Sequence, residues 1–166
     1  MTEYCKPSLV GLPGRRRLAL VVLIVSLAAC SSEPGPLELA PGQELYLRHC
    51  ASCHGNQGQG RPPTFPPLAG SEWMELPSEA LALIILLGLR GEIEVAGRTY
   101  RGYMPPMQHI SDEDIAELIG FTEREWSGRE PRLTATDIAD IRGAFDGRRP
   151  PLYRKEGLLD ALAELP

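Results

Sequence analysis

The chain has 166 residues, of which 43% are hydrophobic and 23% charged, and its formal net charge is −5. This composition allows one compact domain with an extension and excludes a chain that is disordered throughout. Only 6% of the residues are aromatic, whereas there are 17 Gly and 16 Pro. Such a composition favours short helices separated by irregular loops over a long β-sheet, so we predict an all-α fold.

The N-terminus predicts an export signal over residues 1–29. Three arginines at 15–17 precede an apolar run over 18–29 that is too short to span a bilayer. The run ends at Cys30 in the sequence Leu-Ala-Ala-Cys, which resembles the lipobox of bacterial lipoproteins. A hydrophobic signal followed by an unrelated cysteine is the alternative. We predict a lipid on Cys30, which places the protein on the outer, periplasmic face of a bacterial membrane without crossing it.

Removal of the signal changes the charge of the mature protein. Residues 1–29 carry four basic side chains and one acidic one, so their loss takes the formal net charge from −5 to −8. This charge disfavours nucleic acid and favours a partner with a positive patch, unless it only keeps an exported protein soluble. Residues 30–41 are rich in Ser, Pro and Gly, which predicts a flexible tether between the lipid and the domain.

The first half of the remaining chain predicts two helices and two loops. Residues 42–50 are compatible with a short helix, and Ser78 can cap a nearly continuous apolar helix that ends near Gly88. Residues 55–70 are rich in Gly and Pro, so this loop is ordered only if something large organises it. In residues 91–103 polar and apolar side chains alternate and glycines mark two turns, which predicts an irregular loop or a minimal hairpin.

Two further helices are predicted by their capping residues. Ser111 is followed by three acidic residues and by apolar residues on one helix face, and Thr134 with Asp137 repeats this signature. Residues 146–166 form a C-terminal extension, in which we predict a basic turn and a short helix that packs against the domain or against a partner.

The motif Cys50-Ala-Ser-Cys53-His54 carries the strongest chemical signal. A C-x-x-C-H sequence in an exported chain predicts covalent attachment of haem, with thioether bonds to both cysteines and His54 beneath the iron. A thioredoxin-like site lacks its βαβ context, a zinc site needs two more ligands, and a structural disulfide leaves His54 unexplained. One covalent haem c is therefore the predicted cofactor.

The order of motifs over about 42–145 resembles the class I cytochromes c, and more closely the small monohaem cytochromes similar to the cytochrome domains of membrane-bound dehydrogenases. Besides C-x-x-C-H, the matching segments are G-x-x-x-Y from Gly42 to Tyr46, FPPLAGSEW over 65–73, GLRGEIEVAGRTYRGYMPP over 88–106 and ISDEDIAEL over 110–118. The resemblance implies a cytochrome c domain of short helices wrapped around one haem.

The resemblance also implies roles for individual residues. The carbonyl of Pro66 is expected to accept the Nδ1 proton of His54, and Leu68 to pack against the haem. Met104 in the segment before the prolines corresponds to the distal iron ligand of the family. Met107 and His109 follow Met104 closely, so each remains an alternative ligand.

The same resemblance implies a contact between helices, at a distance from the iron ligands. Gly42 and Tyr46 are expected to meet Leu118 and Phe121, where the first and last helices of the family touch. Separately, several polar side chains could hydrogen-bond the haem propionates or offset their charge. Ordinary loop packing is the alternative explanation for these side chains. The side chains concerned are Trp73, Tyr100, Tyr103, Arg98 and Arg101.

Function is predicted as single-electron transfer rather than enzymatic catalysis. The expected partners are a dehydrogenase or quinol-oxidising complex and a terminal oxidase or reductase. Two alternatives remain: a haem sensor or peroxidase with a labile distal site, and a fixed cytochrome subunit held in a larger complex through residues 146–166.

Overall fold

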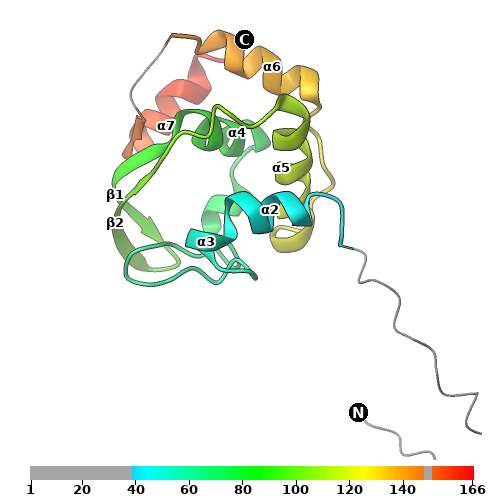
Figure 1. Cartoon of the computed structure of the whole chain (residues 1–166). Helices are drawn as coiled ribbons and strands as arrows, with labels where there is room; N and C mark the ends of the chain where they lie inside the picture. The colour runs from blue at the N-terminus through cyan, green and yellow to red at the C-terminus, as the bar shows by residue number, and fades with distance from the viewer. Residues whose placement is uncertain (1–38, 148–150) are drawn as a thin grey trace, which may run out of the picture. The chain divides into compact units, whose positions relative to one another are not determined.

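The computed structural model describes residues 39–147 and 151–166 (Figure 1). The predicted signal peptide, Cys30 and most of the tether lie outside the described residues. Within the ranges that are described, none of the helices combines the length and the apolar character that crossing a bilayer requires.

Short helices dominate the described chain. In order they are α2 (Gln43–His49), α3 (Ala51–His54), the 3-10 helix η2 (Glu72–Glu75), α4 (Ser78–Leu87), α5 (Asp112–Trp126), α6 (Ala135–Ala144) and α7 (Arg154–Ala163). The predicted caps of α5 and α6 are confirmed, because Ser111 Oγ accepts from Asp114 N at 3.1 Å and Thr134 forms a reciprocal capping box with Asp137. The predicted cap of α4 is wrong: Pro77 occupies the cap position, and Ser78 is the first helical residue.

The fold is mostly helical, but a small sheet corrects the expectation of an all-α domain. Strands β1 (Leu89–Val95) and β2 (Arg98–Met104) form an antiparallel hairpin, and β3 (Leu152–Tyr153) pairs parallel with the start of β1. Ala96 and Gly97 turn the hairpin with φ of 48° and 70°, the left-handed pair that two-residue hairpins use. On both sides of this turn the two strands pair over seven residues each, from Leu89 with Met104 to Val95 with Arg98.

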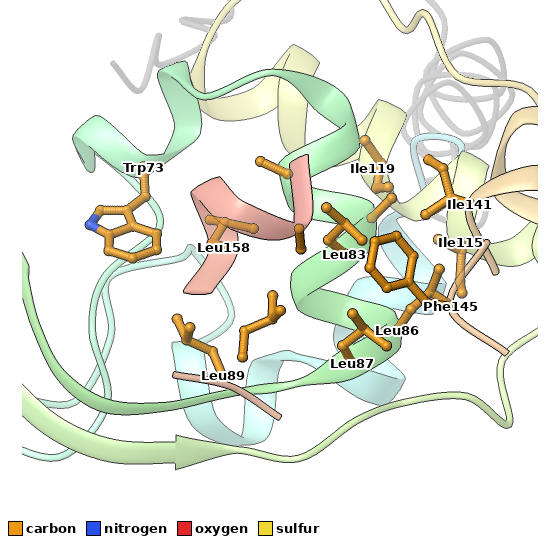
Figure 2. Packing of buried hydrophobic residues seen from close by; sticks show 14 of the residues in the cluster. Trp73, Leu83, Leu86, Leu87, Leu89, Ile115, Ile119, Ile141, Phe145 and Leu158 are labelled. Carbon is orange, nitrogen blue, oxygen red and sulfur yellow. The ribbon is translucent and has the colours of Figure 1, made fainter. Parts of the chain in front are cut away.

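Two clusters of buried side chains hold the helices together. The larger cluster surrounds α4, whose Leu83 is fully buried against side chains of α5, α6 and α7 (Figure 2). The smaller cluster joins Tyr46 and Ala51 to Leu118 and Phe121, which confirms the expected contact between the first helix and α5. Tyr46 is fully buried, and its ring centre lies 5.6 Å from that of Phe121.

The C-terminal segment belongs to the larger cluster. Leu152 and Leu158 are buried in it, and α7 lies beside α4 and β1 (Figure 1). Lys155 Nζ lies 5.7 Å from the centre of the Trp73 ring, within reach of a cation–π contact. Leu159, in contrast, keeps 48% of its surface exposed. The main apolar side chains of α7 are therefore used within the chain itself.

The approach of α2 to α5 depends on Gly42. This residue has φ of +79°, and a Cβ there would lie 2.5 Å from the Glu117 carbonyl oxygen and 2.7 Å from the Phe121 Cβ. Both distances are shorter than any stable contact, so a side chain at this position forces the two helices apart.

Gly42→Ala is expected to lower the free energy of unfolding by about 2–5 kcal/mol, combining left-handed strain with overpacking. Gly128 has φ of +63° with nothing within 4 Å of its virtual Cβ, so Gly128→Ala is the matched control for strain alone and should cost about 1–2 kcal/mol. Denaturant titration of both variants measures the difference, and equal losses would contradict the close approach.

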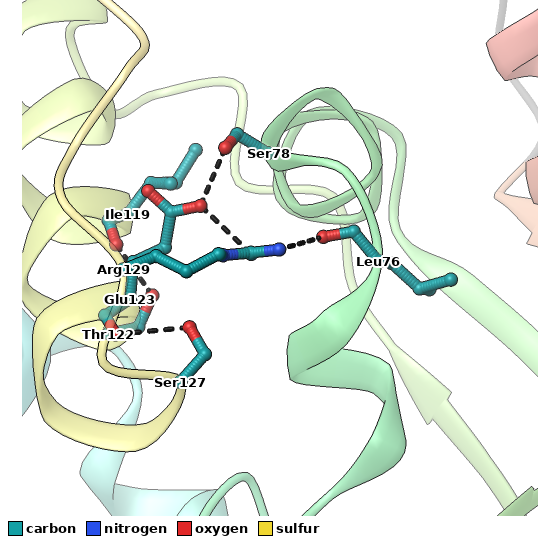
Figure 3. A network of polar contacts seen from close by, with 7 residues as sticks. All are labelled: Leu76, Ser78, Ile119, Thr122, Glu123, Ser127 and Arg129. Carbon is teal, nitrogen blue, oxygen red and sulfur yellow. Dashed lines mark hydrogen bonds and ion pairs between the residues drawn. The ribbon is translucent and has the colours of Figure 1, made fainter.

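A buried polar network ties α5 to the start of α4 (Figure 3). Glu123 is only 1% exposed, and its Oε1 accepts from Ser78 Oγ at 2.5 Å and from Arg129 Nη2 at 2.9 Å. Arg129 Nη1 also donates to the Leu76 carbonyl at 2.9 Å. Glu123 Oε2 and Arg129 Nε have no partner, so the network is incompletely satisfied. Arg129 is the cation that compensates a carboxylate removed from water.

Arg129→Ala should therefore destabilise the protein by about 3–5 kcal/mol, because it leaves the Glu123 carboxylate buried and unpaired. Adding Glu123→Gln should recover part of that loss, since the amide carries no charge. The exposed pair of Arg48 with Glu44 provides the control: Arg48→Ala should cost no more than about 1 kcal/mol. Chemical unfolding of the variants tests this, and an additive double variant would argue against the charge explanation.

Candidate functional site

An apolar cavity of about 330 Å³ lies between α3, the loop at 64–68, α4 and the β1–β2 hairpin. Nearly all of its surface is contributed by carbon and sulfur atoms of the lining side chains. All six residues predicted to bind the cofactor line this cavity: Cys50, Cys53, His54, Pro66, Leu68 and Met104. A cavity of this size and polarity suits a flat hydrophobic ligand held by a few polar groups.

The two cysteines are held at the junction of α2 and α3. Cys53 N and His54 N both donate to the Cys50 carbonyl, at 3.1 and 2.9 Å, so the motif forms one tight turn. Both thiols are free and half-buried. Burial raises the pKa of Cys50 to about 12, and the nearby Cys53 adds to the rise. Redox-active cysteine pairs have lowered thiol pKa values, so this environment is unlike that of a thioredoxin-type site.

His54 is oriented by a backbone carbonyl. Its Nδ1 lies 2.9 Å from the Pro66 carbonyl oxygen, which accepts the Nδ1 proton. Burial lowers the pKa of His54, and the hydrogen bond to Pro66 only partly opposes this. With its proton on Nδ1, the neutral ring leaves Nε2 as the nitrogen that can bind a metal.

The Gly-rich loop that carries Pro66 is fastened to α3 through its backbone. Gly60 N donates to the His54 carbonyl and Leu68 N to the Gly58 carbonyl, both at 2.7 Å. The buried hydroxyl of Tyr46 donates to the Gly55 carbonyl at 2.5 Å, and burial is the main cause that raises the pKa of Tyr46 to about 12. Close backbone contacts thus order this loop, although its Gly- and Pro-rich composition alone predicts an irregular segment.

Two methionines lie on the wall formed by the hairpin and the segment after it. Met104 ends β2 opposite Leu89, and Met107 N donates to the Ile85 carbonyl of α4 at 2.8 Å. Both side chains line the cavity. His109 is exposed, and its ring lies beside that of His49 instead of in the cavity wall.

The polar side chains expected near the cavity have different surroundings. Trp73 Nε1 donates to the Glu94 carbonyl at 2.8 Å, so the indole N–H is already engaged. Tyr100 is buried and Tyr103 is 57% exposed, and both line the cavity. Arg101 pairs with Glu92 on the outer face of the hairpin.

Sequence reasoning missed the contribution of α4 to the cavity. Leu81, Ile84 and Ile85 line it from one side, and Arg90 lies at its edge on β1. The near-continuous apolar run of this helix was the available signal: it indicated burial on most faces, and one of those faces borders the cavity.

The residues present fit a covalently attached haem. The cavity combines an apolar lining, two free thiols on one turn and an imidazole whose Nδ1 is engaged by a backbone carbonyl. In the described ranges, no group of three or more His, Cys, Asp or Glu side chains is placed to hold a metal ion, which argues against the zinc alternative. The site is therefore that of a haem protein whose cofactor is bonded through cysteine.

Comparison with known proteins agrees with this class. The family model for cytochrome c matches residues 39–123. The chain is similar to a cytochrome c-552 of Thermus thermophilus, with 40% identity over 116 residues, covering 64% of this chain and 77% of the relative. A second cytochrome c-552 from the same species is 41% identical over 113 residues, covering 62% of this chain and 85% of the relative.

A more distant relative is the cytochrome c subunit of the quinone alcohol dehydrogenase of Gluconobacter oxydans. It is 30% identical over 104 residues, which cover 61% of this chain but only 22% of that subunit. The chain belongs to the cytochrome c family, as an electron-transfer protein with one covalently bound haem c.

Proposed function

We propose that this protein is a monohaem electron carrier, anchored by lipid, that passes single electrons between larger redox complexes and catalyses no reaction of its own. The observation that carries the proposal is the hydrogen bond from His54 to the Pro66 carbonyl at the wall of an apolar cavity that also contains both thiols. Haem supplies an iron that alternates between two oxidation states and so carries one electron at a time.

In this proposal the roles of the site residues are separate. Cys50 and Cys53 form the thioether bonds, and the free Nε2 of His54 binds the iron on one side. Pro66 fixes the imidazole plane and strengthens it as a donor, and Leu68 contributes apolar surface beside the cofactor. Met104, which also lines the cavity, would be the second iron ligand, and its thioether would favour the reduced state.

Met104 is favoured over the two alternatives by position. His109 is exposed and outside the cavity wall, so it is poorly placed to bind an iron held by His54. Met107 does line the cavity, but its backbone is tied to the Ile85 carbonyl. Its flexible side chain suits the filling of space at the cofactor edge.

The apolar lining and the two candidate iron ligands together favour electron transfer over catalysis. Apolar side chains would exclude water from a bound haem, and a methionine thioether bound to the iron would leave no coordination site open for a substrate or gas. Cys53 and Tyr103 remain partly exposed, so a haem bonded to the cysteines would have an edge close to solvent and to any partner. These features favour a carrier over the sensor or peroxidase alternative.

The C-terminal segment favours a diffusing carrier over a fixed subunit. A docking arm should present a continuous apolar face, yet Leu158 and Ala161 of α7 are buried within this chain, and the exposed Tyr153 and Leu159 are single side chains beside them. Because the described part of 146–166 is used internally, we prefer a protein that meets its partners transiently.

The sequence supports the location and the partners in this proposal. The export signal at 1–29, the lipobox cysteine Cys30 and the tether at 30–41 favour a domain held on the periplasmic face of a bacterial membrane. The relatives that are subunits of a quinone alcohol dehydrogenase favour a dehydrogenase or quinol-oxidising complex as donor. A terminal oxidase or reductase would then be the acceptor.

Met104→Ala should open the distal position, so the reduced variant is expected to bind carbon monoxide rapidly, whereas the wild type resists it. Met107→Ala is the matched control and should keep the wild-type absorption spectrum and resistance. Visible spectra before and after addition of carbon monoxide measure both. Carbon monoxide binding by the Met107 variant alone, or by the wild type, would contradict the assignment.

Cys30→Ser should abolish lipidation, so that the mature protein moves from the detergent phase to the aqueous phase after Triton X-114 partition of cells. Cys5 lies in the predicted signal, so Cys5→Ser should leave the partition unchanged. Mass spectrometry of the mature N-terminus identifies the attached acyl chains. A wild-type protein found wholly in the aqueous phase would refute the anchor.

A further inference from the structure

The sequence contains three histidines, and the two that are not His54 meet on the surface. The ring centres of His49 and His109 are 5.9 Å apart, with 59° between the ring planes. His49 is the last residue of α2 and lines the cavity, while His109 lies in the turn that follows Met107. The pair joins the end of α2 to the turn after Met107, and His49 and Met107 both contribute to the cavity lining.

Both histidines stand on backbone that is already fixed. Next to His49, Cys50 N donates to the Tyr46 carbonyl at 2.8 Å and closes the last turn of α2. Around His109, the guanidinium of Arg142 donates to the carbonyls of Gln108 and Ile110 at 2.9 and 2.8 Å. The backbone at both histidines is therefore fixed by contacts that do not depend on the rings, so a ligand has only the side-chain torsions left to order.

The spacing suits two ligands on one ion. With metal–nitrogen bonds of about 2.0–2.1 Å, two imidazoles around a tetrahedral ion hold their ring centres roughly 5–6 Å apart. His109 is exposed and His49 is half-buried, so an ion can reach both rings from solvent. Imidazole is a good ligand for Zn²⁺, Cu²⁺ and Ni²⁺ and a poor one for Ca²⁺ or Mg²⁺.

We propose that His49 and His109 form a binding site for a transition-metal dication of the Zn²⁺ or Cu²⁺ type, separate from the haem iron. Within the described residues, no third His, Cys, Asp or Glu completes a larger cluster. Water fills the remaining positions, which makes the site exchangeable and weaker than a four-ligand structural site. A bound ion links the end of α2 to the turn at Gln108 and His109 across the edge of the cavity.

A plain ring contact is the competing explanation. Aromatic rings in proteins commonly pack with centres about 4.5–7 Å apart, and 5.9 Å is within that range. A plain ring contact predicts no affinity for metal, so a measurement of metal binding distinguishes this explanation from the proposed site.

Isothermal titration of ZnCl₂ into the untagged holoprotein tests the proposal. We expect one saturable Zn²⁺ per protein. Loss of an outer contact to a metal ligand costs about 10–100-fold in affinity, so His49→Gln and His109→Gln should each cost at least tenfold. The double variant should show no such site, whereas Gln108→Ala, which changes an exposed neighbour, should bind as the wild type does. Zn²⁺ should also raise the melting temperature of the wild type and not that of the double variant.

Absence of saturable binding in the wild type overturns the proposal, as does less than a tenfold loss in either single variant. If a variant does not fold, the wild type alone still decides, using Cu²⁺ as the probe. Its electron paramagnetic resonance spectrum should report two equivalent nitrogen ligands, and a spectrum with none or one overturns the site.

Discussion

The hydrogen bond that holds the His54 ring against the Pro66 carbonyl is the constraint on which the rest of the structure depends. It orients an imidazole in an apolar wall with its Nδ1 engaged, and burial lowers the pKa of that ring. The carbonyl is held in turn by a loop whose amides bond back to α3, and α3 is held by Tyr46 in the cluster with α5. The wall of the cavity that carries His54 is therefore rigid, because the loop supports the carbonyl, α3 supports the loop, and the cluster with α5 supports α3.

The opposite wall is built from segments far apart in the sequence. The hairpin and the turn after Met107 form it, and they rest on α4 and on parts of the chain beyond residue 123, where the family match ends. Leu152 and Leu158 complete the core behind β1 and α4. The C-terminal part of the chain, beyond the family match, therefore supports the wall of the cavity that carries the methionines.

Local chemistry could be predicted from the sequence, and long-range pairing could not. The attachment motif, the caps at Ser111 and Thr134 and the apolar character of α4 all act over a few residues, so their patterns are visible in the chain. The parallel pairing of Leu152 with Leu89 and the pairing of His49 with His109 depend on the path of the whole backbone. Ser78 illustrates the limit: its hydroxyl was expected to cap a helix, but it is used by the buried Glu123, which lies 45 residues away.

The clasp of Arg142 on the carbonyls of Gln108 and Ile110 has a consequence for the order in which the contacts around the cavity form. The thiols, His54 and Pro66 all lie within residues 50–66, and the contact that joins His54 to Pro66 spans only 12 residues. The two hydrogen bonds of the clasp span 34 and 32 residues, because Arg142 lies in α6. Because a contact over few residues costs less loop-closure entropy than one over many, we expect the contact of His54 with Pro66 to form before Arg142 closes the turn at 108–110.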